Sequence, residues 1–208
     1  MEDALTLAPS RAFPGLNFET KEGTNESQSE ASIQYLLHRG FRMKIRLATH
    51  NDLDPVLHLI GRAVPLMQAS GNFQWSADYP NAPVFARDLE LQQLWIAEQN
   101  DTLAGVAAIT NDQSPEYADA GWDLSEEAIV THRLAVDPDF RGHGIARALM
   151  QHAEAVAHAR STRQLRVDTN SQNQPMQQLF VKLSYQFAGE IGLATRPGLR
   201  FFCYGKTL

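Results

Sequence analysis

Cysteine is nearly absent from this sequence, in which Cys203 is the single one among 208 residues. One cysteine excludes an intramolecular disulfide framework and fits a reducing compartment, so we expect a cytoplasmic protein. Cys203 lies in the apolar run FFCY at 201–204, which favours a buried strand position. Cys and His residues at metal-ligand spacing are also missing, and we therefore expect no metal site.

Long hydrophobic runs and an excess of positive charge are missing as well. No segment approaches the roughly 20 apolar residues of a membrane-spanning helix, and the N-terminal stretch MEDALTLAPSRAF lacks the pattern of a secretory signal. Lys and Arg number 18 against 24 Asp and Glu, which gives a formal net charge of −6. This balance argues against binding to nucleic acid or to a membrane. An anionic cofactor stays possible, because a local nest of backbone N–H groups binds phosphate whatever the net charge.

The N-terminal region differs in composition from the rest of the chain. Residues 19–32, ETKEGTNESQSEAS, are polar and contain no aromatic side chain, which is typical of a flexible segment. The short apolar patch at 33–37 favours one docked helical turn. Regular alternation begins only with the strand-like run 43–47. We therefore predict a polar extension over 1–42 and one compact domain over 43–208, which is long enough to bury its own core.

Strand-like and helix-like patterns alternate from residue 43 on. Strands are expected at 43–47, 94–98, 103–109, 128–136, 165–169, 187–191 and 199–204, and helices from Thr49 or Asn51 to about 69 and at 83–92, 144–160 and 175–183. Pro65 is expected to end or kink the first helix. The strands that flank the 144–160 helix should be parallel. The pattern predicts an α/β or α+β domain, with a mixed sheet and helices on both faces.

The stretch DFRGHGIARALM at 139–150 follows a predicted strand and opens a predicted helix. Glycines there allow close approach of a ligand to the backbone, and a helix start offers unpaired N–H groups to phosphate. A glycine-containing turn before an Ala-rich helix is the equally simple alternative. The dinucleotide fingerprint G-x-G-x-x-G fails, because Arg147 stands where its third glycine belongs. No Walker-type Gly-Lys-Ser/Thr occurs either.

Several linked motifs resemble the GNAT N-acetyltransferases, of the bacterial small-molecule type. The spacing Arg141-x-x-Gly144-x-Ala146 matches the family signature R/Q-x-x-G-x-G/A. Before it, THRLAVDP at 131–138 resembles the family's fourth strand, and after it LRV at 165–167 resembles the fifth. NQPMQQLFVKLSY at 173–185 is similar to N-x-x-A-x-x-L-Y-x-K-x-G-F. The resemblance covers about residues 43–205.

This resemblance implies a mostly antiparallel, twisted sheet whose two central parallel strands splay apart to admit acetyl-CoA. The implied cofactor-binding residues are Leu134, Ala135, Val136, Arg141, Gly142, His143, Gly144, Ile145, Ala146 and Asn173. Backbone groups of the strand would meet the pantetheine amides, and the N–H groups of 141–146 would hold the pyrophosphate. For Asn173, capping the following helix is an equally good explanation.

The resemblance also implies acetyl transfer to a primary amine of a small molecule or peptide, which needs a group that removes the amine proton. We expect His132 in this role, because imidazole titrates near neutral pH; a strand histidine hydrogen-bonded to a neighbour is the alternative. Weaker candidates for this role are Glu126, Glu127 and Asp168. Phe180 stands where many relatives carry a tyrosine acid. Two further histidines, His152 and His158, are expected to face solvent.

The acceptor is expected beside the loop that follows the first helix. Trp75 and Tyr79 are the candidate substrate residues, with Phe73, Asp78 and the loop 112–127 nearby. Aromatic rings and carboxylates suit a cationic amine, although both rings could simply pack the loop against the core. Two other classes stay open: a catalytically degenerate module that binds acetyl-CoA, and a nucleotide-binding module of another fold. An exposed hairpin or the C-terminal strand could also pair two subunits into a homodimer.

Overall fold

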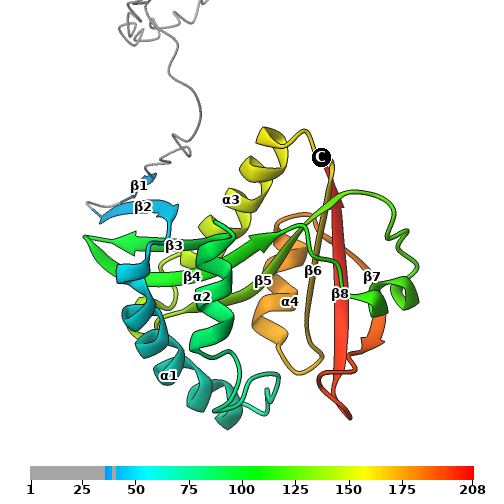
Figure 1. Ribbon diagram of the computed structural model, residues 1–208, viewed down its shortest axis with the longest axis horizontal. Coiled ribbons are helices and arrows are strands. Elements are labelled where there is room, and N and C mark those ends of the chain that lie inside the picture. The colour runs from blue at the N-terminus through cyan, green and yellow to red at the C-terminus, as the bar shows by residue number, and fades with distance from the viewer. Residues whose placement is uncertain (1–35, 39–40) are drawn as a thin grey trace, which may run out of the picture. The chain divides into compact units, whose positions relative to one another are not determined.

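A computed structural model describes residues 36–38 and 41–208, with side chains from residue 42 on (Figure 1). Most of the expected extension over 1–42 therefore lies outside the described residues. Strand β1 (Leu36–His38) and the start of β2 (Phe41–Leu47) precede the expected boundary at residue 43 and belong to the sheet. The helical turn expected at 33–37 is wrong at its C-terminal end, because Leu36 and Leu37 pair with β2 as a strand.

The fold is built on one sheet of eight strands in the order β1-β2-β3-β4-β5-β6-β8-β7. After β1 and β2 come β3 (Leu94–Gln99), β4 (Thr102–Thr110), β5 (Ala128–Val136), β6 (Gln164–Asn170), β7 (Gln186–Gly192) and β8 (Arg200–Thr207). Strands β5 and β6 pair in parallel, and the other neighbouring pairs are antiparallel. The predicted mixed, mostly antiparallel sheet is confirmed, and so is its parallel pair.

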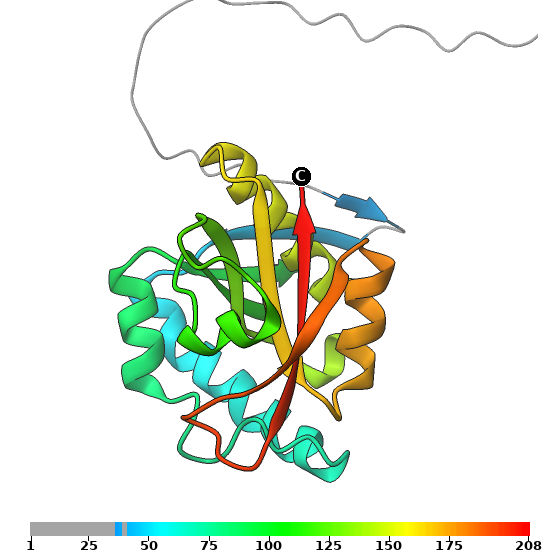
Figure 2. The ribbon, with the colours of Figure 1, turned by 90° about the vertical axis from the view of Figure 1, so that its right-hand side faces the viewer.

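Helices cover both faces of this sheet, as predicted (Figures 1 and 2). They are α1 (Leu53–Ala69), α2 (Ala82–Glu90), α3 (Ile145–Ala159) and α4 (Gln174–Lys182), with 3-10 turns at His50–Asp52, Pro115–Ala120 and Pro138–Phe140. One apolar cluster joins α1 and α2 to the sheet, and another joins α3 and α4 to it. In Figure 2, α2 and α4 lie at opposite sides of the sheet. No helix of the described part is long and apolar enough to cross a membrane.

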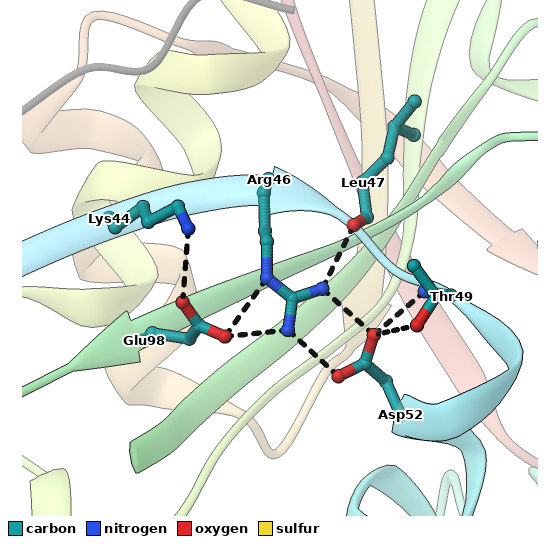
Figure 3. A network of polar contacts seen from close by, with 6 residues as sticks. All are labelled: Lys44, Arg46, Leu47, Thr49, Asp52 and Glu98. Carbon is teal, nitrogen blue, oxygen red and sulfur yellow. Dashed lines mark hydrogen bonds and ion pairs between the residues drawn. The ribbon is translucent and has the colours of Figure 1, made fainter. Parts of the chain in front are cut away.

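Polar contacts tie the start of α1 to the sheet (Figure 3). Arg46 of β2 donates to Glu98 of β3 at 2.6 Å and to both carboxylate oxygens of Asp52 at 2.8 and 2.9 Å. The bonds from Arg46 are the main reason that the pKa of Asp52 is lowered to about 2. The helix then runs through Pro65 to Ala69, so Pro65 does not end it.

A bulge in β5 changes which face its side chains occupy. Val106 of β4 pairs with Ala135, and Ala108 pairs with His132, so β5 holds one extra residue at this point. Arg133, inside the bulge, has a positive φ of 51°. Ile129 packs in the α3 and α4 cluster before the bulge, whereas Leu134 and Val136 do so after it. The bulge thus turns even-numbered side chains toward the face that odd-numbered ones occupy earlier.

From the bulge onward, β5 and β6 no longer pair with each other. Their ladder joins Ala128–Val136 to Gln164–Asn170 only as far as Thr131 and Val167. Residues 132–136 of β5 and 168–170 of β6 continue without mutual pairing, while β6 stays bonded to β8. The predicted splay of the two parallel strands is therefore present, and it leaves one edge of β5 available to a ligand.

Candidate active site

The larger of two cavities at this opening has a volume of about 940 Å³. It is lined by the end of β5, the turn before α3 with the first turn of that helix, one side of α4 along its length, and the last turns of α1. Its charged lining residues are Arg141, Arg147 and Lys182, and no Asp or Glu is among the described residues that line it. In a chain of net charge −6, three cations without a carboxylate favour an anionic ligand.

The turn before α3 leaves several backbone donors free. Gly142 and Gly144 have φ values of 81° and 82°, which only glycine adopts readily, and a Cβ at either position would meet nothing within 4 Å. Ala148 is the first residue of α3 whose N–H bonds back to the turn, at 2.9 Å from the Gly144 oxygen. The N–H groups of 145–147 therefore have no helical partner. Open space above two glycines and a helix start fits a phosphate-bearing ligand.

Gly105 of β4 fixes how closely α3 approaches the sheet. A Cβ on Gly105 would lie 2.5 Å from Ile145 Cγ2 and 3.3 Å from Leu149 Cδ1. Ile145 and Leu149 are both fully buried. Only glycine at this point permits the close contact that brings the first turn of α3 beside the end of β5.

The second cavity, of about 350 Å³, adjoins the first. Its lining comes from the loop after α1, the loop after β4, the bulge of β5, the end of β6, α4 and the loop between β7 and β8. The two cavities share four lining residues, Gln74, Leu134, Asn173 and Met176. A ligand in one can therefore reach a ligand in the other where β5 and β6 separate.

His132 and Asp168 supply the second cavity with proton acceptors. His132 Nε2 lies 3.0 Å from the backbone oxygen of Asp112. Because a carbonyl only accepts, Nε2 carries the hydrogen and Nδ1 keeps the lone pair in the neutral ring. Asp168 Oδ1 accepts from the Tyr117 hydroxyl at 2.5 Å. Tyr117 is fully buried, and its burial, followed by the Asp168 charge, raises its pKa well above the usual value, so it stays a donor.

A buried ion pair holds the bulge in place. Arg133 Nε and Nη2 each donate to a different carboxylate oxygen of Asp88, both at 2.7 Å. Asp88 lies on α2 and is 2% exposed, and it also accepts from Gln93 at 2.8 Å. Burial lowers the pKa of Arg133, but the hydrogen bonds and charge of Asp88, together with Tyr79, outweigh it and the net pKa is raised. This bidentate ion pair fixes Arg133, the positive-φ residue of β5, beside the second cavity.

Comparison with known proteins agrees with this arrangement. A family model described as "Acetyltransferase (GNAT) family" matches residues 65–185, more than half of the chain. The chain belongs to the GNAT acetyltransferase family. It is an acyltransferase enzyme of that family, whose members take acetyl groups from acetyl-CoA.

Individual relatives of this GNAT acetyltransferase agree with that assignment. The chain is similar to the uncharacterized N-acetyltransferase YesJ of Bacillus subtilis, with 25% identity over 68% of this chain and 81% of the relative. A GNAT acetyltransferase structure from Streptococcus agalactiae has a TM-score of 0.72 and 28% identity, covering 85% of this chain and 99% of that one. The acetyltransferase yncA of Salmonella typhimurium, solved with acetyl-CoA, has the same fold at 18% identity and TM-score 0.60, covering 80% and 94%.

The GNAT residues expected to bind acetyl-CoA lie together, with one exception. Nine of the ten line the larger cavity. The exception is His143, whose Nδ1 lies 3.2 Å from Gln99 Oε1 and whose ring meets Phe140 edge-on. Asn173 precedes α4 without a side-chain capping bond; its Nδ2 instead donates to Thr169 Oγ1 at 2.8 Å.

The residues expected around the acceptor are divided by the structure. Trp75, Tyr79, His132 and Asp168 all line the smaller cavity. Phe73 and Asp78 do not line it, and neither do Glu126 and Glu127; Glu126 instead pairs with Arg166 at 3.1 Å. Phe180 lines the cavity as a ring that is 1% exposed and has no hydroxyl.

Three features of the site or its scaffold escaped sequence reasoning. Gln74 and Arg196 come from loops without a motif, and nothing in their sequence neighbours marks them. His152, expected to face solvent, is 2% exposed and packs against Trp95, with 4.1 Å between ring centroids and ring planes tilted by 56°. Its position one turn after Leu149, on the apolar stripe of α3, was the signal that could have found it.

Proposed function

We propose that this enzyme transfers the acetyl group of acetyl-CoA directly to a primary amine of a small molecule or peptide. The observation that carries the proposal is the junction of the two cavities. The larger one is basic and backbone-lined, and the smaller one holds groups that accept protons. Their shared residues lie where β5 and β6 separate, so donor and acceptor can be bound at the same time.

The larger cavity is assigned to acetyl-CoA because its lining fits an anionic group. The glycine turn and the first N–H groups of α3 would hold the pyrophosphate, assisted by Arg141 and Arg147. The free edge of β5 at 134–136 would bind the pantetheine amides. The Asn173 amide, whose oxygen has no partner among the described residues, would accept from the same arm.

When bound, acetyl-CoA supplies a thioester. The amine nitrogen forms a C–N bond with the thioester carbonyl carbon, and the C–S bond breaks. CoA leaves as a thiolate, which then takes up a proton. We assign removal of the amine proton to His132 Nδ1, since Nε2 is held by the Asp112 carbonyl. Asp168 attracts the ammonium form of the acceptor into the cavity. A backbone N–H near Leu134, which lines both cavities, would donate to the developing oxyanion.

A thiol-release assay tests the proposal. Purified protein is mixed with acetyl-CoA and pooled amines, amino acids and peptides, and free CoA thiol is measured over time. We expect acceptor-dependent release above the rate of acetyl-CoA hydrolysis. Tight binding of acetyl-CoA without release for any acceptor would instead favour the degenerate binding module, which the missing hydroxyl at Phe180 supports.

A further inference from the structure

The smaller cavity contains a cation that the proposed chemistry does not use. Arg196 lies on the loop between β7 and β8 and lines the cavity beside Tyr79 and Gln74. Its guanidinium stacks on the Tyr79 ring, with Cζ 4.0 Å from the ring centroid. Its Nε donates to the Gln74 backbone oxygen at 3.1 Å, and Nη1 donates to the Thr195 oxygen at 2.6 Å. These contacts hold the guanidinium in one plane at the cavity wall.

Arg196 differs from the other arginine of this cavity in lacking a carboxylate partner. The Arg133 fork is neutralised by Asp88, whereas Arg196 forms no ion pair with any described residue. An arginine has five N–H donors, and two of those on Arg196 are used. The remaining three are left to a ligand or to water. A planar guanidinium held this way matches an oxyanion such as a carboxylate.

The cavity therefore carries charges of both signs. Asp112 and Asp168 supply carboxylates on the loop after β4 and on β6, and Arg196 supplies the cation on the loop after β7. A ligand with one ammonium and one oxyanion group would satisfy both signs in about 350 Å³. A simple alkyl amine would leave the arginine without a counter-charge.

We propose that the acceptor is a small amine that also carries an oxyanion, as an amino acid does, and that Arg196 binds this oxyanion. This inference rests on the proposed acetyl transfer, since the amine is assigned to the side of His132 and Asp168. Arg196 is then the residue that selects amines with an oxyanion group over amines without one.

The experiment compares matched pairs of acceptors in wild-type protein and in Arg196→Gln. Each pair is an amino acid and the amine that lacks its carboxylate, with aminoalkylphosphonates as a second oxyanion arm. We expect wild type to prefer the oxyanion member by about 10- to 100-fold in kcat/KM, the range of a charged hydrogen-bonded contact. Arg196→Gln should lose that preference mainly through KM, and kcat/KM for the amine that lacks the oxyanion should change little. The phosphonate arm shows whether the arginine accepts carboxylates alone.

Arg200→Gln is the control, because Arg200 lies near the same loop but pairs with exposed Glu190 and does not line the smaller cavity. It should keep the wild-type preference. Arg196 also fastens its loop to Gln74, and a purely structural role would lower kcat/KM equally for both members of a pair. Such an equal loss, or a wild type without preference, would overturn the inference.

Calorimetry decides the question even when turnover fails. Protein saturated with CoA is titrated with each acceptor, and we expect binding of oxyanion amines that Arg196→Gln abolishes. If no acceptor releases thiol but this binding is seen, the proposed transfer fails while the role of Arg196 stands. If thiol is released but amines with an oxyanion group bind no better than amines without one, the proposed function stands and the role of Arg196 fails.

Discussion

The two cavities are built from different parts of the polypeptide. The larger cavity, which we assign to acetyl-CoA and call the donor side, relies on backbone groups. These are two positive-φ glycines, the open first turn of α3 and the free edge of β5. The smaller cavity, which we call the acceptor side, relies on side chains, among them His132, Asp168 and Arg196, which come from three separate segments. Backbone donors recognise any ligand with phosphates and amides, whereas side chains change with each substitution. The contrast explains how one fold can keep its donor and vary its acceptor.

The sharpest test of this contrast removes one acceptor side chain. We expect His132→Gln to lower kcat/KM by about 10²- to 10⁴-fold, because the amine proton loses its acceptor. The Kd for acetyl-CoA should not change, since His132 does not line the larger cavity. Stopped assays and calorimetry measure the two quantities. His58→Gln, on an exposed position of α1, is the control. Full activity of His132→Gln beside an inactive Asp168→Asn would move the role of base to Asp168.

The second prediction removes the ion pair between Asp88 of α2 and Arg133, which holds the β5 bulge beside the smaller cavity. Asp88→Asn leaves the Arg133 guanidinium buried without a counter-charge, and we expect the free energy of unfolding to fall by about 3 to 5 kcal/mol. Urea unfolding at pH 7 measures it. Glu190→Gln removes an exposed ion pair with Arg200 and should cost at most about 1 kcal/mol. An equal loss of unfolding free energy in the two variants would show that the bulge does not depend on the ion pair between Arg133 and Asp88.

Acid should lower the stability of the domain through His152, which is buried on α3. Burial lowers the pKa of His152 to about 4 from its usual 6.5, so between these values the unfolded state binds the proton and the folded state does not. The free energy of unfolding should therefore be complete above about pH 6.5 and fall as the pH drops toward 4, by up to about 3 kcal/mol. Urea midpoints at pH 7 and pH 5 measure this. His152→Leu should reduce the pH dependence, and His158→Gln, at an exposed site, should retain it.

A backbone change gives the smallest effect and tests the donor side directly. Gly144→Ala puts a methyl group on a residue with φ of 82°, and we expect acetyl-CoA to bind about 10-fold more weakly as the turn shifts to relieve the strain. Gly121→Ala, with the same φ and equally open surroundings but outside both cavities, carries the same strain. It should lose stability without losing affinity. A matching loss of affinity in both variants would mean that the turn itself does not bind the cofactor.

The sequence predicted the donor side better than the acceptor side for the same physical reason. Residues 139–150 form a local motif whose function depends on backbone conformation, and glycine at fixed spacing reports such a conformation directly. The elements themselves were also predicted closely, with β5 found at 128–136 as expected. Periodicity records burial, and burial decides helices and strands.

The residues of the smaller cavity and the bulge in β5 have no comparable local sequence pattern. Arg196 reaches Gln74 across 122 positions of sequence, and no local pattern reports a contact of that range. The prediction that His152 faces solvent was wrong, because His152 lies on the apolar stripe of α3 despite its polar side chain. The role of His132 as base stays a prediction, as does the boundary at residue 43.

The bulge at Arg133 makes the spacing within β5 as important as its composition. Because side chains alternate between the two faces of a strand, one extra residue in β5 moves every side chain that follows to the opposite face. Deleting Arg133 would remove no conspicuous donor from the larger cavity, yet it would exchange Leu134 and Val136 for Ala135 on the α3 face. Insertions and deletions in this strand should therefore be far less tolerated than substitutions.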